Sequence, residues 1–150
     1  MVVIGIDPGT TQSALVEWDG AKILDMQIMD NELLVVNLRY PTAGKVLAIE
    51  WLESMGMRVG KEVFITCRWI GRFHEAWGAD PVYVPRSQVK LHLCGQRRAN
   101  DADIRQALID RFGAPGKKKE PGPTFGLKKD TWQSFATAVT AWDQLSSKVP

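Results

Sequence analysis

The sequence has no long apolar segment, only two cysteines and two histidines, and almost no excess of charge of either sign. No run approaches the ~20 apolar residues of a membrane-spanning helix, so we expect no integral membrane protein. The first residues lack the basic region of a secretory signal, because apolar residues lead directly into Asp7. Cys67 and Cys94 form no CxxC pair and have no clustered histidines, which favours a reducing compartment over a disulfide scaffold or zinc site. We therefore expect a cytoplasmic protein.

The composition itself is typical of a globular protein. Hydrophobic residues make up 45% of the 150 residues and charged residues 24%, which argues against disorder. This length predicts one domain, residues 1–150, that buries roughly 70% of the surface of its unfolded chain. The net charge of +2 is unevenly distributed: residues 1–66 have 5 basic and 9 acidic residues, whereas residues 86–129 have 11 basic and 4 acidic. A basic region of this kind is typical of surfaces that contact phosphates.

The order of the strand and helix patterns predicts an α/β domain with a mixed five-stranded sheet. β-branched or alternating runs predict strands at 2–7, 12–18, 21–29, 45–52 and 81–84. The first three strands are joined by short turns, including a two-residue turn at Asp19-Gly20, and therefore form an antiparallel meander. Helices are predicted at 31–40 (capped by Asp30 and ended by Pro41), 61–77, from Pro85-Arg86 to Gly95, about 100–112, and 129–145.

Residues 61–77 allow two interpretations. Val63 and the next three residues favour a strand by propensity. Apolar and aromatic residues nevertheless recur at helical spacing over four turns, which is too long for a typical strand, so we predict a helix. The residues that define this spacing are Val63, Cys67, Ile70, His74 and Trp77. Residues 113–128, rich in Gly, Pro and Lys, predict an exposed basic loop.

Three carboxylates stand at positions that favour a metal site. Asp7 ends the first strand beside a tight turn, where open α/β sheets place their sites. Glu50 interrupts an apolar strand, and a buried carboxylate is costly unless it is paired or metal-bound. If the first and fourth strands are neighbours, these two residues can meet. Asp130 begins the last helix, with Gln133 and Ser134 on the same face. Oxygen ligands of this kind suit Mg²⁺, alone or as a two-ion site for phosphodiester hydrolysis.

Four segments of the chain, in this order, resemble the RuvC Holliday-junction resolvases. They are IGIDPGTTQSAL at 4–15, LAIEWL at 47–52, VPRSQVKLHLCGQRRANDADIRQAL at 84–108 and KKDTWQSFATAVTAW at 128–142. The resemblance implies an RNase H-like fold of the retroviral integrase superfamily, a homodimer, and Mg²⁺-dependent cleavage of four-way DNA junctions, with Mn²⁺ as a substitute. The short chain is most similar to bacteriophage members, which act in the bacterial host cytoplasm in DNA recombination and repair.

The resemblance also implies roles for individual residues. Asp7 and Glu50 match the first two catalytic, metal-binding carboxylates of the family. Asp130 matches the third, and Gln133 stands where the family has a further Asp. Asp101 takes a place that is usually Lys. The predicted DNA contacts are Arg86, Lys90, Arg97, Arg98, Lys117, Lys118, Lys119, Lys128 and Lys129, and the helix at 61–77 is the predicted dimer surface.

Two other functions remain open from the sequence. Because Gln133 is neutral and a weaker metal ligand than Asp, the chain could bind junctions with weak or no cleavage. The segment IDPGTT also resembles the first phosphate loop of actin/Hsp70-type ATPases, in which Gly9, Thr10 and Thr11 would cradle phosphates. Those enzymes need two such domains and an adenosine pocket, for which 150 residues are too few.

Overall fold

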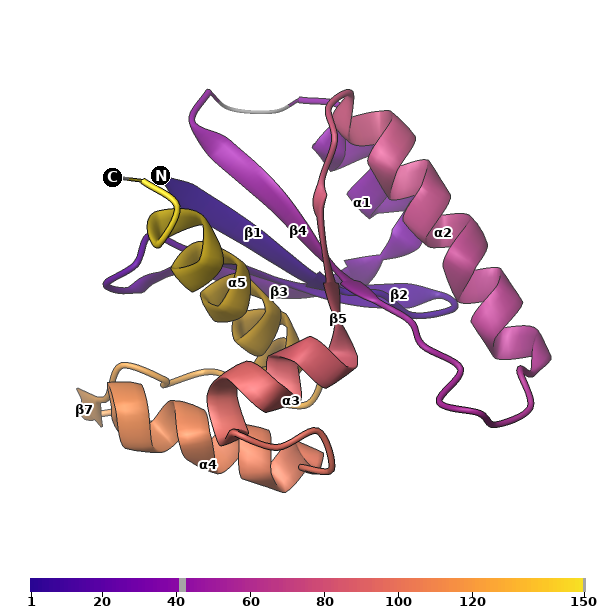
Figure 1. Ribbon diagram of the computed structural model, residues 1–150. Helices are drawn as coiled ribbons and strands as arrows, with labels where there is room; N and C mark the ends of the chain where they lie inside the picture. Colours follow the sequence, from indigo (N-terminus) through magenta and orange to yellow (C-terminus); the bar gives the residue numbers. More distant parts are fainter. Residues whose placement is uncertain (41–42, 150) are drawn as a thin grey trace.

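The computed structural model describes residues 1–40 and 43–149 and has a five-stranded mixed sheet at its centre (Figure 1). The strands are β1 Val2–Asp7, β2 Gln12–Trp18, β3 Ile23–Asp30, β4 Lys45–Trp51 and β5 Val82–Pro85. They lie in the order β3-β2-β1-β4-β5. The first three are antiparallel, and β4 and β5 continue the sheet in parallel to β1. The predicted α/β fold class and strand arrangement are confirmed.

Helices cover both faces of this sheet (Figure 1). α1 Asn31–Leu38 and α2 Lys61–Trp77 pack on one face, where they share a core with Ile4 and Ile6 of β1. α5 Thr131–Ser146 packs on the other face, with α3 Arg86–Cys94 and α4 Asp101–Phe112 outside it. No helix in the described part of the chain is long and apolar enough to cross a membrane.

Gly5 brings α5 unusually close to the sheet. A Cβ atom at Gly5 would lie 2.3 Å from the carbonyl oxygen of Ser134 and 2.7 Å from the backbone nitrogen of Ala138, which no real side chain could do. The missing side chain therefore lets the backbone of α5 lie directly against β1. As a result, residues 131–141 are buried around the whole helix rather than along one stripe.

Several details differ from the sequence prediction. The loop between β2 and β3 has four residues, because the Asp19 carboxylate accepts hydrogen bonds from the N–H groups of Ala21 and Lys22 and β3 begins only at Ile23. The predicted basic loop contains a short hairpin, formed by β6 Gly116–Lys117 and β7 Glu120–Pro121. Pro41, the expected end of α1, lies outside the described residues.

The buried face of α2 is also rotated from the predicted one. Ile70 and Trp77 are buried as expected, but Cys67 is exposed and Val63 and His74 are only partly covered. The other buried positions are Thr66, Trp69 and Phe73. The larger aromatic side chains determine which face packs inward, because they bury the most apolar area.

Candidate active site at the ends of β1 and β4

Asp7 and Glu50 lie on adjacent strands and face the same layer. Ile6 of β1 pairs in parallel with Ile49 of β4, so Asp7 and Glu50 are the next residues along the two neighbouring strands. Val3 and Ala48 contribute to the core on the α5 side of the sheet. Because side chains alternate along a strand, Asp7 and Glu50 point to that side as well. β1 and β4 are therefore neighbours, which is the condition that the sequence analysis set for Asp7 and Glu50 to meet.

Asp130 is placed beside this pair by α5. It occupies the N-cap position of the helix, one residue before its first turn, but among the described residues its carboxylate makes no capping hydrogen bond. Its exposed side chain lines a hollow with Gln133, which is 6% exposed. The Asp130 side chain therefore does not cap α5, although the residue stands at the cap position.

Burial and like charges together disfavour the ionised form of the site. Burial is the main reason that the pKa of Asp7 rises from 3.8 to about 8, and the negative charges of Glu50 and Asp130 raise it further. Glu50 is only 2% exposed, and this burial raises the pKa of its carboxyl group, although the positive charge of Arg86 lowers it. The site therefore has an excess of negative charge that a bound cation would relieve.

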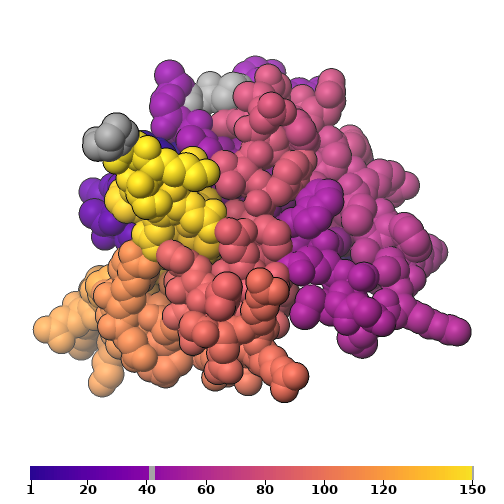
Figure 2. Space-filling view, in the orientation of Figure 1, coloured from indigo at the N-terminus to yellow at the C-terminus, as the bar shows by residue number. Residues whose placement is uncertain are grey.

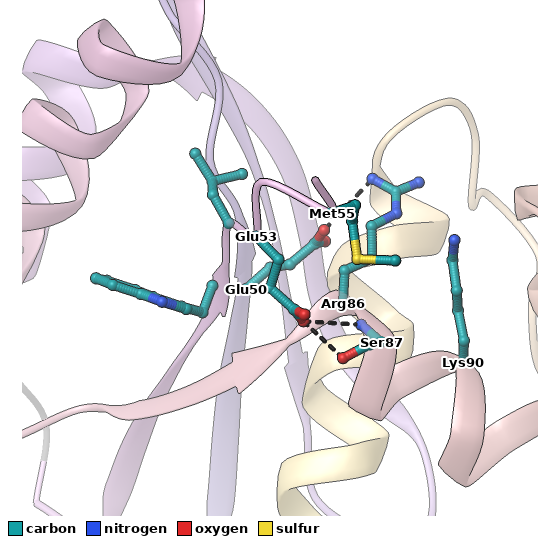
Figure 3. Close-up of a pocket in the computed structure, with 8 residues that line it drawn as sticks. Glu50, Glu53, Met55, Arg86, Ser87 and Lys90 are labelled. Carbon is teal, nitrogen blue, oxygen red and sulfur yellow. Dashed lines mark hydrogen bonds and ion pairs between the residues drawn. The ribbon is translucent and has the colours of Figure 1, made fainter. Parts of the chain in front are cut away.

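Arg86 is the basic side chain that contacts this acidic group. Its Nη1 atom lies 3.4 Å from Oε1 of Glu50, and its Nη2 atom bonds the carboxylate of Asp101 at the start of α4. Glu50 and Arg86 point toward one another across a pocket (Figure 3). Arg86 is the first residue of α3, whose start is held by two hydrogen bonds from Ser87 to the Glu53 carboxylate. One arginine thus connects a strand carboxylate with a helix carboxylate.

Two hollows adjoin these carboxylates. One, of about 200 Å³, is lined by Glu50 together with Trp51, Leu52, Glu53, Met55, Arg86, Ser87 and Lys90. The other, of about 400 Å³, is lined by Asp130 together with Asp101, Ala102, Arg105, Lys129, Trp132 and Gln133. The ion pair between Arg86 and Asp101 joins the lining of the first hollow to that of the second. Both hollows contain carboxylates and cationic side chains, a combination that suits a phosphate and its metal ions.

The chemistry of the donors fits Mg²⁺ or Mn²⁺, both of which prefer oxygen ligands. The carboxyl groups of Asp7 and Glu50 are buried neighbours, and their raised pKa values mean that a nearby positive charge is needed to keep both ionised. Within residues 1–40 and 43–149, however, no three acidic, histidine or cysteine side chains are grouped closely enough to enclose an ion as they stand. An ion held by three of these side chains would therefore require side-chain movement, and Arg86 is the group that lies against Glu50.

The residues predicted to contact DNA occupy two regions. Arg86, Lys90 and Lys129 line the hollows beside the carboxylates. Arg97 and Arg98 are exposed in the connection between α3 and α4, and Lys128 is exposed before α5. The lysines of the β6–β7 hairpin lie at the far end of α4 from Asp101 (Figure 1). The segment after β4, which includes Glu53, lies beside the start of α3, which carries Arg86 (Figure 2).

Several contacts in the site were not predicted from the sequence. They are the ion pairs of Arg86, the involvement of Asp101, and the hydrogen bonds of Ser134. Arg86 was expected only to contact DNA, and Asp101 only to alter contacts to its backbone. The partners of Arg86 are 36 and 15 residues away, and no local pattern encodes such a pairing.

The sequence matches no protein-family model and no curated protein. The strand order and the flanking helices define an RNase H-like fold, and two solved structures are similar to it. One is Thermus thermophilus RuvC, with TM-score 0.66, 18% identity and coverage of 98% of this chain and 97% of that one. The other is T. thermophilus RuvC in complex with Holliday junction substrate, with TM-score 0.68, 17% identity and the same coverage. At this identity the likeness establishes the fold.

Proposed function

We propose that this protein is a divalent-metal-dependent DNA endonuclease that resolves Holliday junctions by paired cuts as a homodimer. The observation that carries the proposal is the position of Asp7, Glu50 and Asp130 at one edge of an RNase H-like sheet, beside hollows lined by both acidic and basic side chains. The similar structure of RuvC with a Holliday junction supports branched DNA as the substrate. DNA recombination or repair in a bacterial cytoplasm, with a bacteriophage as the source of the chain, belongs to the same proposal.

Asp7, Glu50 and Asp130 would hold Mg²⁺, or Mn²⁺ in its place. Bound divalent ions supply Lewis-acid activation of water and neutralise charge that develops on the phosphate. Hydrolysis breaks the bond between phosphorus and the 3′ oxygen and leaves 5′-phosphate and 3′-hydroxyl ends. Gln133 can both donate and accept hydrogen bonds, and we assign it the orientation of the water or of a ligand.

The chain's own cations would hold the DNA backbone near these acids. Arg86 and Lys90 on one side and Lys129 on the other contact the cut strand through its phosphates. Arg97, Arg98 and Lys128 extend this contact, and Lys117, Lys118 and Lys119 reach DNA farther from the cut. These contacts are to phosphates and set position rather than sequence preference.

We assign the dimer contact to the outer face of α2. Phe64 is 67% exposed on this face, and Cys67 and Arg68 lie exposed beside it. A second copy that covers the Phe64 ring would remove this apolar surface from water, which favours association. In a two-fold dimer this face meets the same face of the second copy and places two sites for paired cuts.

A junction-binding module with weak or no cleavage is the second candidate. It is favoured by Gln133, which is buried beside Asp130 and contributes no negative charge. The ATPase alternative has less support, because the Gly9 N–H donates to the Ser13 hydroxyl at 3.1 Å and the Gly9 carbonyl accepts from Asn31. That N–H is therefore not free to bind a phosphate.

Incision of labelled DNA tests the proposal. A four-way junction, a replication fork and a linear duplex are incubated in parallel with the protein and Mg²⁺, and the products are separated on denaturing gels. We expect symmetric cuts in the junction that vanish in Asp7→Asn and Glu50→Gln, while gel-shift binding survives. Asp80→Asn, which removes a fully exposed carboxylate between α2 and β5, is the matched control and should cut normally.

The alternatives give different results in the same experiment. Tight junction binding without nicks in Mg²⁺ or Mn²⁺ would establish the binding module instead. Cutting of the linear duplex alone would contradict a resolvase, and cleavage unaffected by either site substitution would contradict the assigned residues. ATP binding in a calorimeter would favour the ATPase.

A further inference from the structure

The Arg86 side chain lies where the proposed site requires a cation. Arg86 contacts Glu50, whose side chain is 3% exposed. The Arg86 side chain itself is 39% exposed to solvent. A buried carboxylate is strongly destabilising without a counter-charge. Within the described residues, Arg86 is the ion-pair partner of Glu50. The acidic site thus already contains a positive group supplied by the protein.

Asp101 holds the guanidinium from the other side. Its carboxylate bonds Nη2 of Arg86, and it lies in the first turn of α4, where the helix dipole stabilises negative charge. The Asp101 side chain is 66% exposed. Exposed ion pairs contribute only ~0–1 kcal/mol, so this contact can break at little cost.

The Arg86 side chain can move away from Glu50 while the backbone of α3 stays in place. The start of α3 is fixed to the segment after β4, since the Ser87 N–H and hydroxyl donate to Glu53 at 3.2 and 2.7 Å. The hollow of about 200 Å³ lies beside Arg86 and is lined on its other side by Lys90 (Figure 3). An arginine that releases Glu50 can therefore remain at the site and face a bound phosphate.

We propose that Arg86 is a built-in counter-ion that competes with divalent metal for Glu50 and, once displaced, binds a DNA phosphate. The proposal rests on the proposed function, because it assumes that the acidic site takes a metal. It makes Arg86 a positioning residue that offsets the charge of Glu50 before metal arrives. The start of α3, fixed to Glu53 by Ser87, keeps the released guanidinium near the cut.

Metal affinity measured without DNA tests this competition. Mn²⁺ is titrated calorimetrically into the full chain, into Arg86→Gln and into Arg98→Gln, which removes an equally charged but exposed side chain from the same surface. We expect Arg86→Gln to bind Mn²⁺ roughly 10-fold more tightly than the wild type, about 1.4 kcal/mol. Arg98→Gln should differ from the wild type by less than about 2-fold, because exposed charges at a distance are screened. Equal or weaker binding by Arg86→Gln than by Arg98→Gln would overturn the competition.

A second measurement uses the wild-type protein and does not depend on the folding of a variant. The Nε–Hε resonance of Arg86 is followed by NMR during titration with Mg²⁺. It should shift as the site fills, whereas that of Arg98 should stay in place. A resonance of Arg86 that does not move at saturating Mg²⁺ would overturn the proposal.

The two proposals fail in different ways. If the wild type binds Mn²⁺ and Glu50→Gln does not, but Arg86→Gln binds as the wild type does, only the counter-ion role is overturned. If neither the wild type nor any variant binds Mn²⁺, the metal-dependent function is overturned, and the role of Arg86 with it.

Discussion

The Ser134 hydroxyl accepts a hydrogen bond from the backbone N–H of Asp7 at 3.3 Å. The same hydroxyl lies 3.3 Å from the carbonyl oxygen of Asp130, to which it donates. One side chain in the first turn of α5 therefore connects the end of β1 with the residue that precedes the helix. Two of the three candidate metal ligands are held relative to each other through this contact.

Replacement of Ser134 should separate positioning from stability. We expect Ser134→Ala to lower the free energy of unfolding by about 1–2 kcal/mol, because the buried Asp7 N–H loses its partner. Incision should fall more than 10-fold even where the protein is fully folded, since Asp7 and Asp130 are no longer aligned. Urea unfolding and junction incision measure the two effects. Ser147→Ala, which removes an exposed hydroxyl at the end of α5, should change neither, and equal effects of both variants would refute the role.

The close approach of β1 and α5 predicts opposite effects at two glycines. Gly5→Ala would place a methyl group against the backbone of α5 and should destabilise the protein by about 3 kcal/mol or more. At Gly71, in the middle of α2, an added Cβ would meet no described atom within 4 Å. Gly71→Ala should therefore stabilise the fold by up to ~1 kcal/mol through helix propensity. Thermal unfolding of both variants tests the prediction, which fails if Gly5→Ala is as stable as the wild type.

The raised pKa of Asp7 predicts pH-dependent stability without metal. Its pKa is about 8 in the fold and near 3.8 when unperturbed, so the folded state binds the proton more tightly than the unfolded state. This contribution to stability is complete below about pH 4 and is lost as the pH rises through about 8. Asp7→Asn cannot ionise and should be more stable than the wild type at pH 8 by more than about 1 kcal/mol.

Unfolding melts at several pH values, with EDTA or with Mg²⁺, measure this difference. The advantage of Asp7→Asn should shrink toward pH 4, and Mg²⁺ should raise the melting temperature of the wild type more than that of the variant. Asp80→Asn serves as the control for loss of an exposed carboxylate. A difference between Asp7→Asn and the wild type that does not depend on pH would contradict the buried, like-charged environment.

The basic hairpin predicts DNA contacts remote from the cut. α4 has 12 residues and therefore spans about 18 Å, with Asp101 at one end and the hairpin beyond the other. Replacement of Lys117, Lys118 and Lys119 by Gln should weaken junction binding and reduce the slope of log K against log salt by about 2–3. The rate of incision of bound junction should be unchanged, because the site is not altered.

Binding at several salt concentrations and single-turnover incision measure these two quantities. The double variant Lys22→Gln/Lys148→Gln removes exposed lysines outside residues 86–129 and should leave the salt slope unchanged. If both variants lowered the slope of log K against log salt equally, the hairpin lysines would affect DNA binding only through the net charge of the protein.

The sequence by itself determined the order of the elements and indicated the main acidic residues of the candidate site. The β-branched run ending in Asp7 and the lone acid in the apolar run around Glu50 are local signals, and their strands form where they were expected. The caps at Asp30 and Asn100 are equally local, because their side chains bond N–H groups only two or three residues away. Such local patterns predict the folded structure correctly because they depend only on residues that are neighbours in the sequence.

Tertiary structure alone decided how these residues meet. The ion pair of Arg86 with Glu50, the hydrogen bond between Ser134 and Asp7, and the closeness of α5 to Gly5 all join distant segments. The same holds for the rotated face of α2, where packing of Trp69 and Phe73 overrides the predicted spacing. The apolar run of β4 shows that Glu50 is buried; only the folded sheet shows which cation neutralises it, because that cation comes from a helix that follows the next strand.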